Sequence, residues 1–399
     1  MADAPSPAQS DWLPRRSYKR RTPKPPIWFL PSCNIGPFMS MSAAIAEDAQ
    51  GAFAGGDIRE QTTRAIDRLR ERLQALNMDL DRLASVQVYL RHPADFAAMN
   101  EIYRRYWPND APARTTVGAR LHHPEALVGF TAVSLPAVEP RETIKPIGWL
   151  DSPNPYSYAV RSGYSVYMSG LVSRDPKTNT PIDGDAAMQT RVIFENAREL
   201  LAACGLQIRD IIFTRLYVTD RAYLTTVDTI FREYFPREPP ARMTMVTPLM
   251  NPKHLVEITM YATKTQPRGL TVAPPRVEWL QTRQDRHYSA VAYARNRLFI
   301  SGMIGVEPDT IGKPVAQVQL ILRRTFRILQ MMRFAWRELR ELTIICRDPS
   351  IAQQVLNELE PLLPVRRFPA GVVVGAEMSS PDADVEIAFF GTRDWQRGF

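Results

Sequence analysis

A five-residue pattern, Pro-Ala-Arg-x-Thr, recurs along this chain at an almost constant interval. It reads Pro112-Ala113-Arg114-Thr115-Thr116 first and Pro240-Ala241-Arg242-Met243-Thr244 second, and a remnant, Pro369-Ala370-Gly371, follows. The third position therefore moves from 114 to 242 to 371, in steps of 128 and 129 residues. A fixed period of this size in a chain of 399 residues predicts one domain copied three times in tandem. The arginine is kept in two copies and is replaced by glycine in the third.

The composition is that of an ordinary globular protein, with 45% hydrophobic and 23% charged residues. No apolar run reaches the roughly 18 residues that a membrane-spanning helix needs, so we expect no membrane partner. The three cysteines, Cys33, Cys204 and Cys346, lie far apart and form neither a disulfide framework nor a metal-ligand spacing. Glycine-rich phosphate-binding patterns are also missing from the sequence. We therefore expect a cytoplasmic protein that needs no metal and no cofactor.

The first 27 residues differ from the rest of the chain. Six lysines and arginines against two aspartates give this segment +4 of the formal net charge of +8. Its many prolines and serines predict a disordered basic tail over residues 1–27. The pair Arg15-Arg16 is followed by no apolar segment, so we do not expect an export signal. A basic tail can touch nucleic acid, but a solvated tail is the favoured interpretation.

Hydrophobic periodicity predicts the same series of elements in each copy: strands, a helix, a strand, a second helix and a final strand. In the second copy, Asp185 is expected to cap the first helix, and Gly205 to end it. The strands and the second helix of that copy are expected at 164–170, 211–218, 224–235 and 255–262. The corresponding elements are expected at 86–90, 96–106 and 127–135 in the first copy and at 297–302, 316–332, 342–346 and 385–390 in the third. This series predicts an α+β fold with helices on one face of a sheet.

The copies are placed at residues 28–137, 148–264 and 277–395. The linkers between them are expected near 136–147 and 264–276, where proline and charged residues gather.

The second copy carries the most complete set of motifs, and these resemble the RidA family, also called the YjgF or L-PSP family. The motifs are Asn154-Pro155-Tyr156-Ser157, Ser169-Gly170, Gly184-Asp185, Gln189-Thr190-Arg191, Glu195-Asn196, Pro240-Ala241-Arg242 and Leu255-Val256-Glu257-Ile258. The resemblance implies chorismate-mutase-like domains that assemble as trimers, with ligand clefts between neighbouring subunits. Three such domains in one chain imply an intramolecular pseudo-trimer that is monomeric as a whole.

The resemblance also implies an activity: hydrolysis of enamines and imines, such as 2-aminoacrylate and 2-iminopropionate, to a keto acid and ammonia without metal or cofactor. The family arginine holds the substrate carboxylate, for which a planar two-donor guanidinium is suited. The family glutamate lies beside the reacting water, where a carboxylate can orient it and move its proton. On this sequence the implied catalytic residues are Arg242, Glu257 and Glu386, and the implied substrate-binding residues are Arg242, Arg114, Tyr156, Ser169, Gly170, Thr244 and Asn100.

The copies depart from the family pattern in different ways. The glutamate position of the first copy is Gly129, and its Ser-Gly pair is Ser42-Ala43; the third copy has Gly371 in place of arginine. The second copy has Asp228 where the first has Asn100, and a carboxylate there would repel an anionic substrate. Because the second copy keeps Tyr156, Ser169 and Gly170, its Arg242 is expected to matter more than Arg114. The junction that uses Gly371 is expected to hold no small carboxylate.

The number of complete sites depends on which copies share a cleft. If arginine and glutamate come from one copy, only Arg242/Glu257 is complete. If they come from adjacent copies, one cyclic order gives Arg114/Glu257 and Arg242/Glu386, and the other gives Arg114/Glu386. In every arrangement at least one cleft lacks the arginine, the glutamate or both.

Three functions therefore remain open. The first is a deaminase or related hydrolase that acts on a small carboxylate-bearing imine, enamine or amide. The second is a non-catalytic protein that binds a small acid or regulates a partner. The third is the ribonuclease activity ascribed to parts of this family, for which the basic tail is the sole support.

Overall fold

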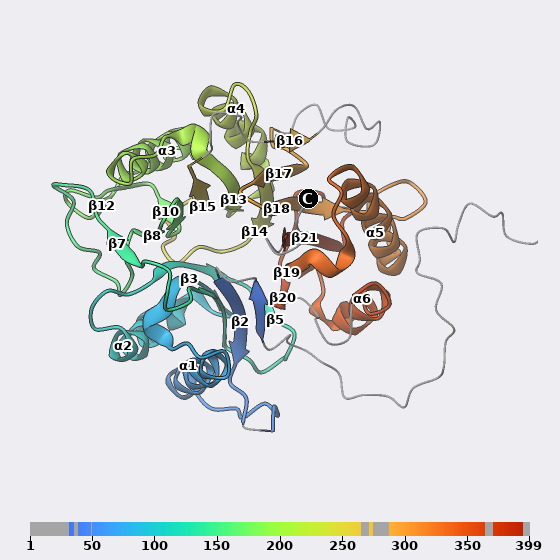
Figure 1. Ribbon diagram of the computed structural model, residues 1–399, viewed down its shortest axis with the longest axis horizontal. Helices are drawn as coiled ribbons and strands as arrows, with labels where there is room; N and C mark the ends of the chain where they lie inside the picture. The colour runs from blue at the N-terminus through green and yellow to red at the C-terminus, as the bar shows by residue number, and fades with distance from the viewer. Residues whose placement is uncertain are drawn as a thin grey trace, which may run out of the picture.

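The computed structural model describes residues 32–35, 39–48, 50–264, 271–273, 287–363 and 370–393. The predicted basic tail at 1–27, the start of the first predicted copy and both ends of the third lie outside these residues. Within them, the chain forms three units of sheet and helix that surround a common centre, with the helices on the outside (Figure 1).

Unit 1 runs from β1 to β6 and appears in blue and cyan in Figure 1. Its sheet has the order β1-β2-β6-β3-β4, and β5 pairs elsewhere. The strands are β1 (Ser32–Ile35), β2 (Met39–Ile45), β3 (Leu83–Leu90), β4 (Ala113–Gly118), β5 (Arg120–Leu121) and β6 (Val128–Ser134), and the helices are α1 (Ile58–Gln74) and α2 (Phe96–Tyr106). Helix α1 begins at Asp57, which forms a capping box with Glu60.

Unit 2 runs from β7 to β15, in green. Its main path is β14-β13-β15-β9-β8-β7, and β10 also pairs with β15. The strands are β7 (Glu142–Ile144), β8 (Ala159–Ser162), β9 (Ser165–Met168), β10 (Leu171–Val172), β11 (Arg174–Asp175), β12 (Thr180–Pro181), β13 (Ile211–Val218), β14 (Ala241–Val246) and β15 (Val256–Thr263), and the helices are α3 (Ala186–Ala203) and α4 (Leu224–Tyr234). The Asp185 side chain accepts the backbone N–H of Met188, so the predicted cap of α3 is confirmed.

Unit 3 runs from β16 to β21, in orange and red. Its sheet has the order β16-β17-β18-β21-β19-β20 and continues into β5 of unit 1. The strands are β16 (Thr271–Ala273), β17 (Val291–Ala294), β18 (Arg297–Ile304), β19 (Leu339–Cys346), β20 (Ala370–Gly375) and β21 (Val385–Thr392), and the helices are α5 (Pro314–Met331) and α6 (Ala352–Leu359). Proline at the first turn of α5 suits a helix start, because its missing N–H has no partner there in any case.

The three sheets share one central arrangement of four strands. It is β2-β6-β3-β4 in unit 1, β9-β15-β13-β14 in unit 2 and β18-β21-β19-β20 in unit 3. In each unit the strand with the Pro-Ala-Arg position, or its remnant, pairs in parallel with the preceding strand. The hydrophobic pattern of the sequence predicts no strand at this position, so these three strands are a finding of the structure. The stretch expected as a linker at 136–147 also contains a strand, β7, which pairs with β8.

A buried glutamine repeats in the three units and ties the first long helix to the segment before the last strand. The amides of Gln61, Gln189 and Gln317 donate to the backbone oxygens of Glu125, Lys253 and Asp382, at 3.1, 2.9 and 2.9 Å. Each also accepts a backbone N–H two residues further along the chain, from Leu127, Leu255 and Asp384. An unpaired amide in these cores would cost about 1–3 kcal/mol, so the position tolerates few other residues.

Equivalent backbone bridges join the units around the ring. Val117 of unit 1 pairs with Leu249 of unit 2, and Val246 of unit 2 pairs with Glu377 of unit 3. The ring closes where Val374 of unit 3 pairs with Leu121 of unit 1. An apolar cluster with members from all three units, including Val117, Met245 and Val374, packs where they meet.

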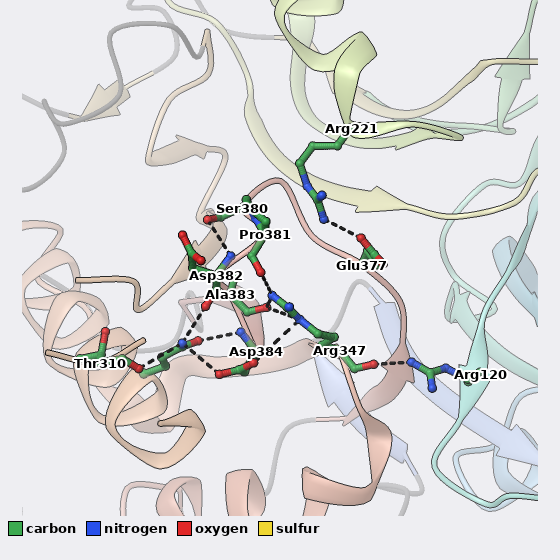
Figure 2. A network of polar contacts seen from close by, with 11 residues as sticks. Arg120, Arg221, Thr310, Arg347, Glu377, Ser380, Pro381, Asp382, Ala383 and Asp384 are labelled. Atoms are coloured by element: carbon green, nitrogen blue, oxygen red, sulfur yellow. Dashed lines mark hydrogen bonds and ion pairs between the residues drawn. The ribbon is translucent and has the colours of Figure 1, made fainter. Parts of the chain in front are cut away.

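Two neighbouring segments of unit 3, one at Arg347 and the loop from Glu377 to Asp384, contact the other two units near this closure (Figure 2). Arg221 of unit 2 forms an ion pair of 2.6 Å with Glu377 and donates to the backbone oxygen of Met378. Arg120 of unit 1 donates to the backbone oxygen of Arg347, whose own guanidinium holds the loop through the Ala383 oxygen. Side chains from each unit therefore reinforce the backbone bridges.

Candidate active site

The arginine of unit 1 is held by the Ser-Gly pair of unit 2. The backbone N–H of Arg114, on β4, donates to the Oγ of Ser169 at 2.8 Å, and the N–H of Gly170 donates to the Arg114 oxygen at 3.2 Å. The Ser169 hydroxyl in turn donates to the Ser157 oxygen at 2.7 Å. With these two bonds the hydroxyl joins two units, which is a positioning role. The expectation that Ser169 and Gly170 surround Arg242 is therefore wrong: they lie at Arg114.

The glutamate of the same cleft also comes from unit 2. Glu257, on β15, lies opposite Val172 of β10 and accepts the backbone N–H of Thr116 from unit 1. A Cβ atom on Gly170 would lie 1.9 Å from Glu257 Oε1. The glycine is therefore required because the carboxyl group packs directly on the backbone at this point. Adjacent units thus supply the Arg114/Glu257 pair. We call this cleft site 1.

Aromatic rings surround the Arg114 guanidinium in site 1. Its central carbon lies 4.6 Å from the ring centroid of Tyr103, 5.7 Å from that of Tyr156 and 5.8 Å from that of Phe96. Such rings attract a cation and also exclude water from it. Asn100, one turn before Tyr103 on α2, donates to the Asn154 side chain of unit 2 at 3.2 Å.

Four buried polar atoms of site 1 have no hydrogen-bond partner within the part of the chain that the structure describes. They are Arg114 Nη1, Asn100 Oδ1, Tyr103 Oη and Thr116 Oγ1. Arg114 itself is only 4% exposed. Buried polar groups in folded proteins are nearly always hydrogen-bonded, and a group of such atoms in one cleft indicates a place for a polar ligand.

Burial sets the protonation of site 1. It raises the pKa of Glu257 to about 8, although Arg114 and the Thr116 N–H both act to lower it. Burial also lowers the pKa of Arg114, but an arginine starts so high that it keeps its charge at neutral pH. At pH 7 the site therefore combines a cationic guanidinium with a mostly protonated carboxyl group, which can act as an acid.

An equivalent cleft, site 2, lies between units 2 and 3. The Arg242 N–H donates to Ser301 Oγ at 2.8 Å, and the Thr244 N–H donates to Glu386 Oε1 at 3.2 Å. A Cβ atom on Gly302 would lie 1.8 Å from Glu386 Oε1, as at Gly170. Adjacent units again supply the pair, so the ring has the cyclic order that gives two complete arginine–glutamate pairs.

Site 2 differs from site 1 at one decisive side chain. Asp228 Oδ1, on α4, lies 2.6 Å from Arg242 Nη1, and both side chains are fully buried. The same carboxylate oxygen accepts the His287 N–H of unit 3 at 3.2 Å. The rings near the Arg242 guanidinium are Phe231 and Tyr288, at 5.1 and 4.7 Å. Asp228 takes the place of Asn100, and Phe231 the place of Tyr103.

The third junction, between units 3 and 1, has lost both groups. Gly371 pairs with Leu342, and a Cβ atom on Gly371 would lie 2.4 Å from the Leu342 oxygen. At the glutamate position, a Cβ atom on Gly129 would lie 3.0 Å from the Leu121 side chain. Ala43 is tolerated in the Ser-Gly position here, since no glutamate packs on it. Neither a guanidinium nor a carboxyl group is therefore present at the equivalent positions of this junction.

The sequence model of the family described as "Endoribonuclease L-PSP" matches residues 21–135 and 149–264, together more than half of the chain. The chain belongs to the L-PSP family. The two matched segments contain the arginines of both sites and Glu257.

Two relatives are each about one unit long. The 3-aminoacrylate deaminase RutC of Acinetobacter baylyi is 33% identical over 123 residues, which are 31% of this chain and 98% of that protein. A RutC family protein of Sulfurisphaera tokodaii is 32% identical over 120 residues, 30% of this chain and 91% of its own.

Among solved structures, a chorismatase covers 89% of this chain and 99% of its own, with 11% identity and a TM-score of 0.54. This likeness concerns the fold alone, and it extends over nearly the whole ring. RidA from an Antarctic Psychrobacter covers 31% of this chain and 100% of its own, at 26% identity and a TM-score of 0.30.

The structure distributes the predicted site residues over two clefts. Site 1 of this L-PSP protein contains Arg114, Asn100, Tyr156, Ser169, Gly170 and Glu257, and site 2 contains Arg242, Thr244 and Glu386. Sequence reasoning missed Tyr103 and Phe96, although their spacing from Asn100 on a helix places all three on one face.

Among the described residues, no three His, Cys, Asp or Glu side chains gather as a metal site. No helix in the described ranges is long and apolar enough to cross a membrane.

Proposed function

We propose that site 1 hydrolyses a small enamine or imine that carries a carboxylate, and releases ammonia and the corresponding oxo acid. The observation that carries this proposal is a buried guanidinium whose Nη1 has no hydrogen-bond partner among the described residues, beside a buried carboxyl group with its pKa raised to about 8. The named activity of the RutC relative, a 3-aminoacrylate deaminase, agrees with this chemistry.

Arg114 binds the substrate carboxylate in the proposed complex. Two parallel hydrogen bonds from a guanidinium fix the orientation of a carboxylate, and aromatic walls make the pair stronger by excluding water. Tyr103 Oη, Asn100 Oδ1 and Thr116 Oγ1 are available for the amino group or for the reacting water.

Glu257 then moves the protons. Its carboxyl proton passes to the enamine carbon that is not bonded to nitrogen, which leaves an iminium group. The resulting carboxylate takes a proton as water adds to the iminium carbon. The same proton then passes to the nitrogen, and the C–N bond breaks with its electron pair on nitrogen. The hydroxyl becomes the carbonyl as its proton returns to the Glu257 carboxylate, which restores the starting acid. One water is consumed and one ammonia leaves; an imine substrate takes the carboxyl proton on its nitrogen and enters at the addition of water. A group with a pKa near 8 can serve as both acid and base near neutral pH.

We further propose that the three units are copies of one domain and that the chain is an intramolecular pseudo-trimer. The common four-strand arrangement, the repeated glutamine and the closed ring of backbone bridges support this. The chain is then a monomer in solution, which light scattering can test. A cytoplasmic location stays a prediction; Cys204 and Cys346 are free and buried, as a reducing compartment allows.

Turnover of freshly generated 2-iminopropionate and 3-aminoacrylate, followed by ammonia release, tests the activity. We expect Arg114→Ala to lower kcat/KM by at least about 30-fold, because a desolvated charge pair contributes on the order of 2–5 kcal/mol. Glu257→Gln should lower kcat with little change in carboxylate binding. Arg242→Ala, the matched variant in site 2, should keep the turnover of the wild type.

Two results would separate the alternatives. A wild-type protein that binds small carboxylates at Arg114 without turnover is the non-catalytic binder. Cleavage of RNA that persists in Arg114→Ala and Glu257→Gln, with no ammonia release in the wild type, would contradict the deaminase proposal.

A further inference from the structure

Sites 1 and 2 differ in the side chain that the neighbouring helix places at the arginine. In site 1 the neighbouring helix supplies an amide, Asn100, and Arg114 Nη1 has no hydrogen-bond partner within the described residues. Arg242 Nε of site 2 also has none there, so the contrast between the two arginines concerns Nη1. In site 2 the equivalent helix supplies the Asp228 carboxylate, 2.6 Å from Arg242 Nη1. Both partners of this pair are fully buried, so solvent does not screen it.

We infer that site 2 is a carboxylate-binding site occupied by the chain's own carboxylate, and that Asp228 alone closes it to small anionic ligands. The inference rests on the proposed role of Arg114, since it assumes that the arginine of each cleft is the carboxylate receptor. It adds that the chain has one working site for a free carboxylate.

The other contacts of site 2 support this inference, because the serine, the glutamate and the tyrosine around Arg242 correspond to those around Arg114. Ser301 holds the Arg242 backbone as Ser169 holds Arg114, and Glu386 accepts a backbone N–H from Thr244 as Glu257 does from Thr116. The Tyr288 ring lies 4.7 Å from the Arg242 guanidinium, and the Tyr156 ring lies 5.7 Å from that of Arg114. Arg242 is therefore held by the same kinds of contact as Arg114. The two arginines differ in that a carboxylate of the chain binds Arg242.

The buried ion pair also gives the physical reason why we expect site 2 not to bind a free carboxylate. A free carboxylate would have to displace Asp228 from Arg242 and leave that second carboxylate buried without its cation. Two buried carboxylates that compete for one guanidinium repel each other strongly, and displacement therefore fails at ordinary ligand concentrations.

The test removes site 1 and then opens site 2, with pyruvate as the probe in titration calorimetry. The wild type should bind one pyruvate per chain, and Arg114→Ala should bind none. Adding Asp228→Asn to Arg114→Ala should restore binding of one pyruvate per chain. Adding Arg242→Ala to that pair should remove it again. Glu233→Gln, an exposed acid-to-amide change on the same helix, is the matched control and should restore nothing.

The reverse exchange is made in site 1. Asn100→Asp should place a carboxylate next to Arg114 and lower pyruvate affinity of the otherwise wild-type chain at least tenfold, with no loss of thermal stability. This variant also decides the question if Arg114→Ala/Asp228→Asn does not fold.

Three results would overturn the inference: two pyruvates per wild-type chain, no pyruvate bound by folded Arg114→Ala/Asp228→Asn, or unchanged affinity in Asn100→Asp. These differ from failure of the proposed function, which would appear as wild-type turnover that survives Arg114→Ala.

Discussion

Sites 1 and 2 are built on the same frame and differ mainly in the counter-ion of their arginine. Both take the arginine from one unit and the glutamate and the Ser-Gly pair from the next. In site 1 the helix supplies a neutral asparagine, and Arg114 Nη1 has no hydrogen-bond partner in the part of the chain that the structure describes. In site 2 an aspartate binds the equivalent Nη1 of Arg242. An arginine in a complete motif can therefore be bound by a carboxylate of its own chain, because a side chain from another element reaches it.

The largest expected difference between the sites is in stability. Arg242→Ala leaves the Asp228 carboxylate buried without its cation and should lower the free energy of unfolding by about 3–5 kcal/mol. Arg114→Ala removes a guanidinium whose described contacts are mainly with aromatic rings and should cost less than about 1 kcal/mol. Chemical denaturation of both variants measures this. The double variant Arg242→Met/Asp228→Leu should recover most of the lost stability. Equal losses of unfolding free energy in Arg242→Ala and Arg114→Ala would contradict the view that Asp228 makes the two sites different.

The second prediction uses the two glycines that lie under the glutamates. Gly170→Ala places a Cβ atom 1.9 Å from Glu257 Oε1, so the carboxyl group must move. Misplacement on this scale should lower kcat/KM about 100-fold. Gly302→Ala makes the same clash with Glu386 in site 2 and should leave turnover as it is. A Gly170→Ala variant with wild-type activity would remove Glu257 from the proposed reaction.

The third prediction concerns the junction that has lost both groups. Gly371→Arg would restore the sequence pattern, but its Cβ atom would meet the Leu342 oxygen at 2.4 Å. We expect a loss of about 1–3 kcal/mol in stability from this overpacking and no gain in pyruvate binding. Calorimetry and thermal unfolding of the variant provide the measurement. A stable Gly371→Arg protein with an additional pyruvate site would contradict the view that the Leu342 backbone leaves no room for an arginine at this position.

The fourth prediction is a pH dependence that belongs to site 1. Because catalysis needs the Glu257 proton, kcat/KM should fall up to tenfold per pH unit above about 8, and Glu257→Gln should lose this fall. The folded pKa is raised above the ordinary value of 4.5, so the folded state holds a proton that the unfolded state releases. Stability should therefore decline as pH rises from about 4.5 to 8 and then level off. A Glu257→Gln protein with the same stability profile would contradict the assignment.

The sequence predicted local structure well because local structure follows from periodicity and capping. The series of helices and strands and the Asp185 cap were confirmed, as was membership of the family. The strand after each second helix was missed. In β4 the sequence Ala-Arg-Thr-Thr shows no alternation of apolar and polar residues, whereas β14, Ala-Arg-Met-Thr-Met-Val, does alternate but is only six residues long.

Which copies combine to form each site could not be predicted from the sequence, for a different reason. Which copy faces which depends on the cyclic order of the ring, and a period of 128 residues is compatible with either order. The expectation that Arg242 matters more than Arg114 for carboxylate binding assumed that the Ser169-Gly170 pair lies at the arginine of its own copy. In the structure this pair lies at Arg114. The sequence did contain the decisive residue, Asp228, but only the structure brings its carboxylate to Arg242.

The covalent ring has a consequence for how such a protein can change. In an assembly of three identical chains, one mutation in the gene appears at every junction at once, so a substitution that silences one pocket silences all of them. Here the aspartate at position 228 affects the pocket between units 2 and 3 and leaves the pocket between units 1 and 2 as it was. Joining the units in one chain therefore lets each pocket gain, lose or exchange a function while another continues to work.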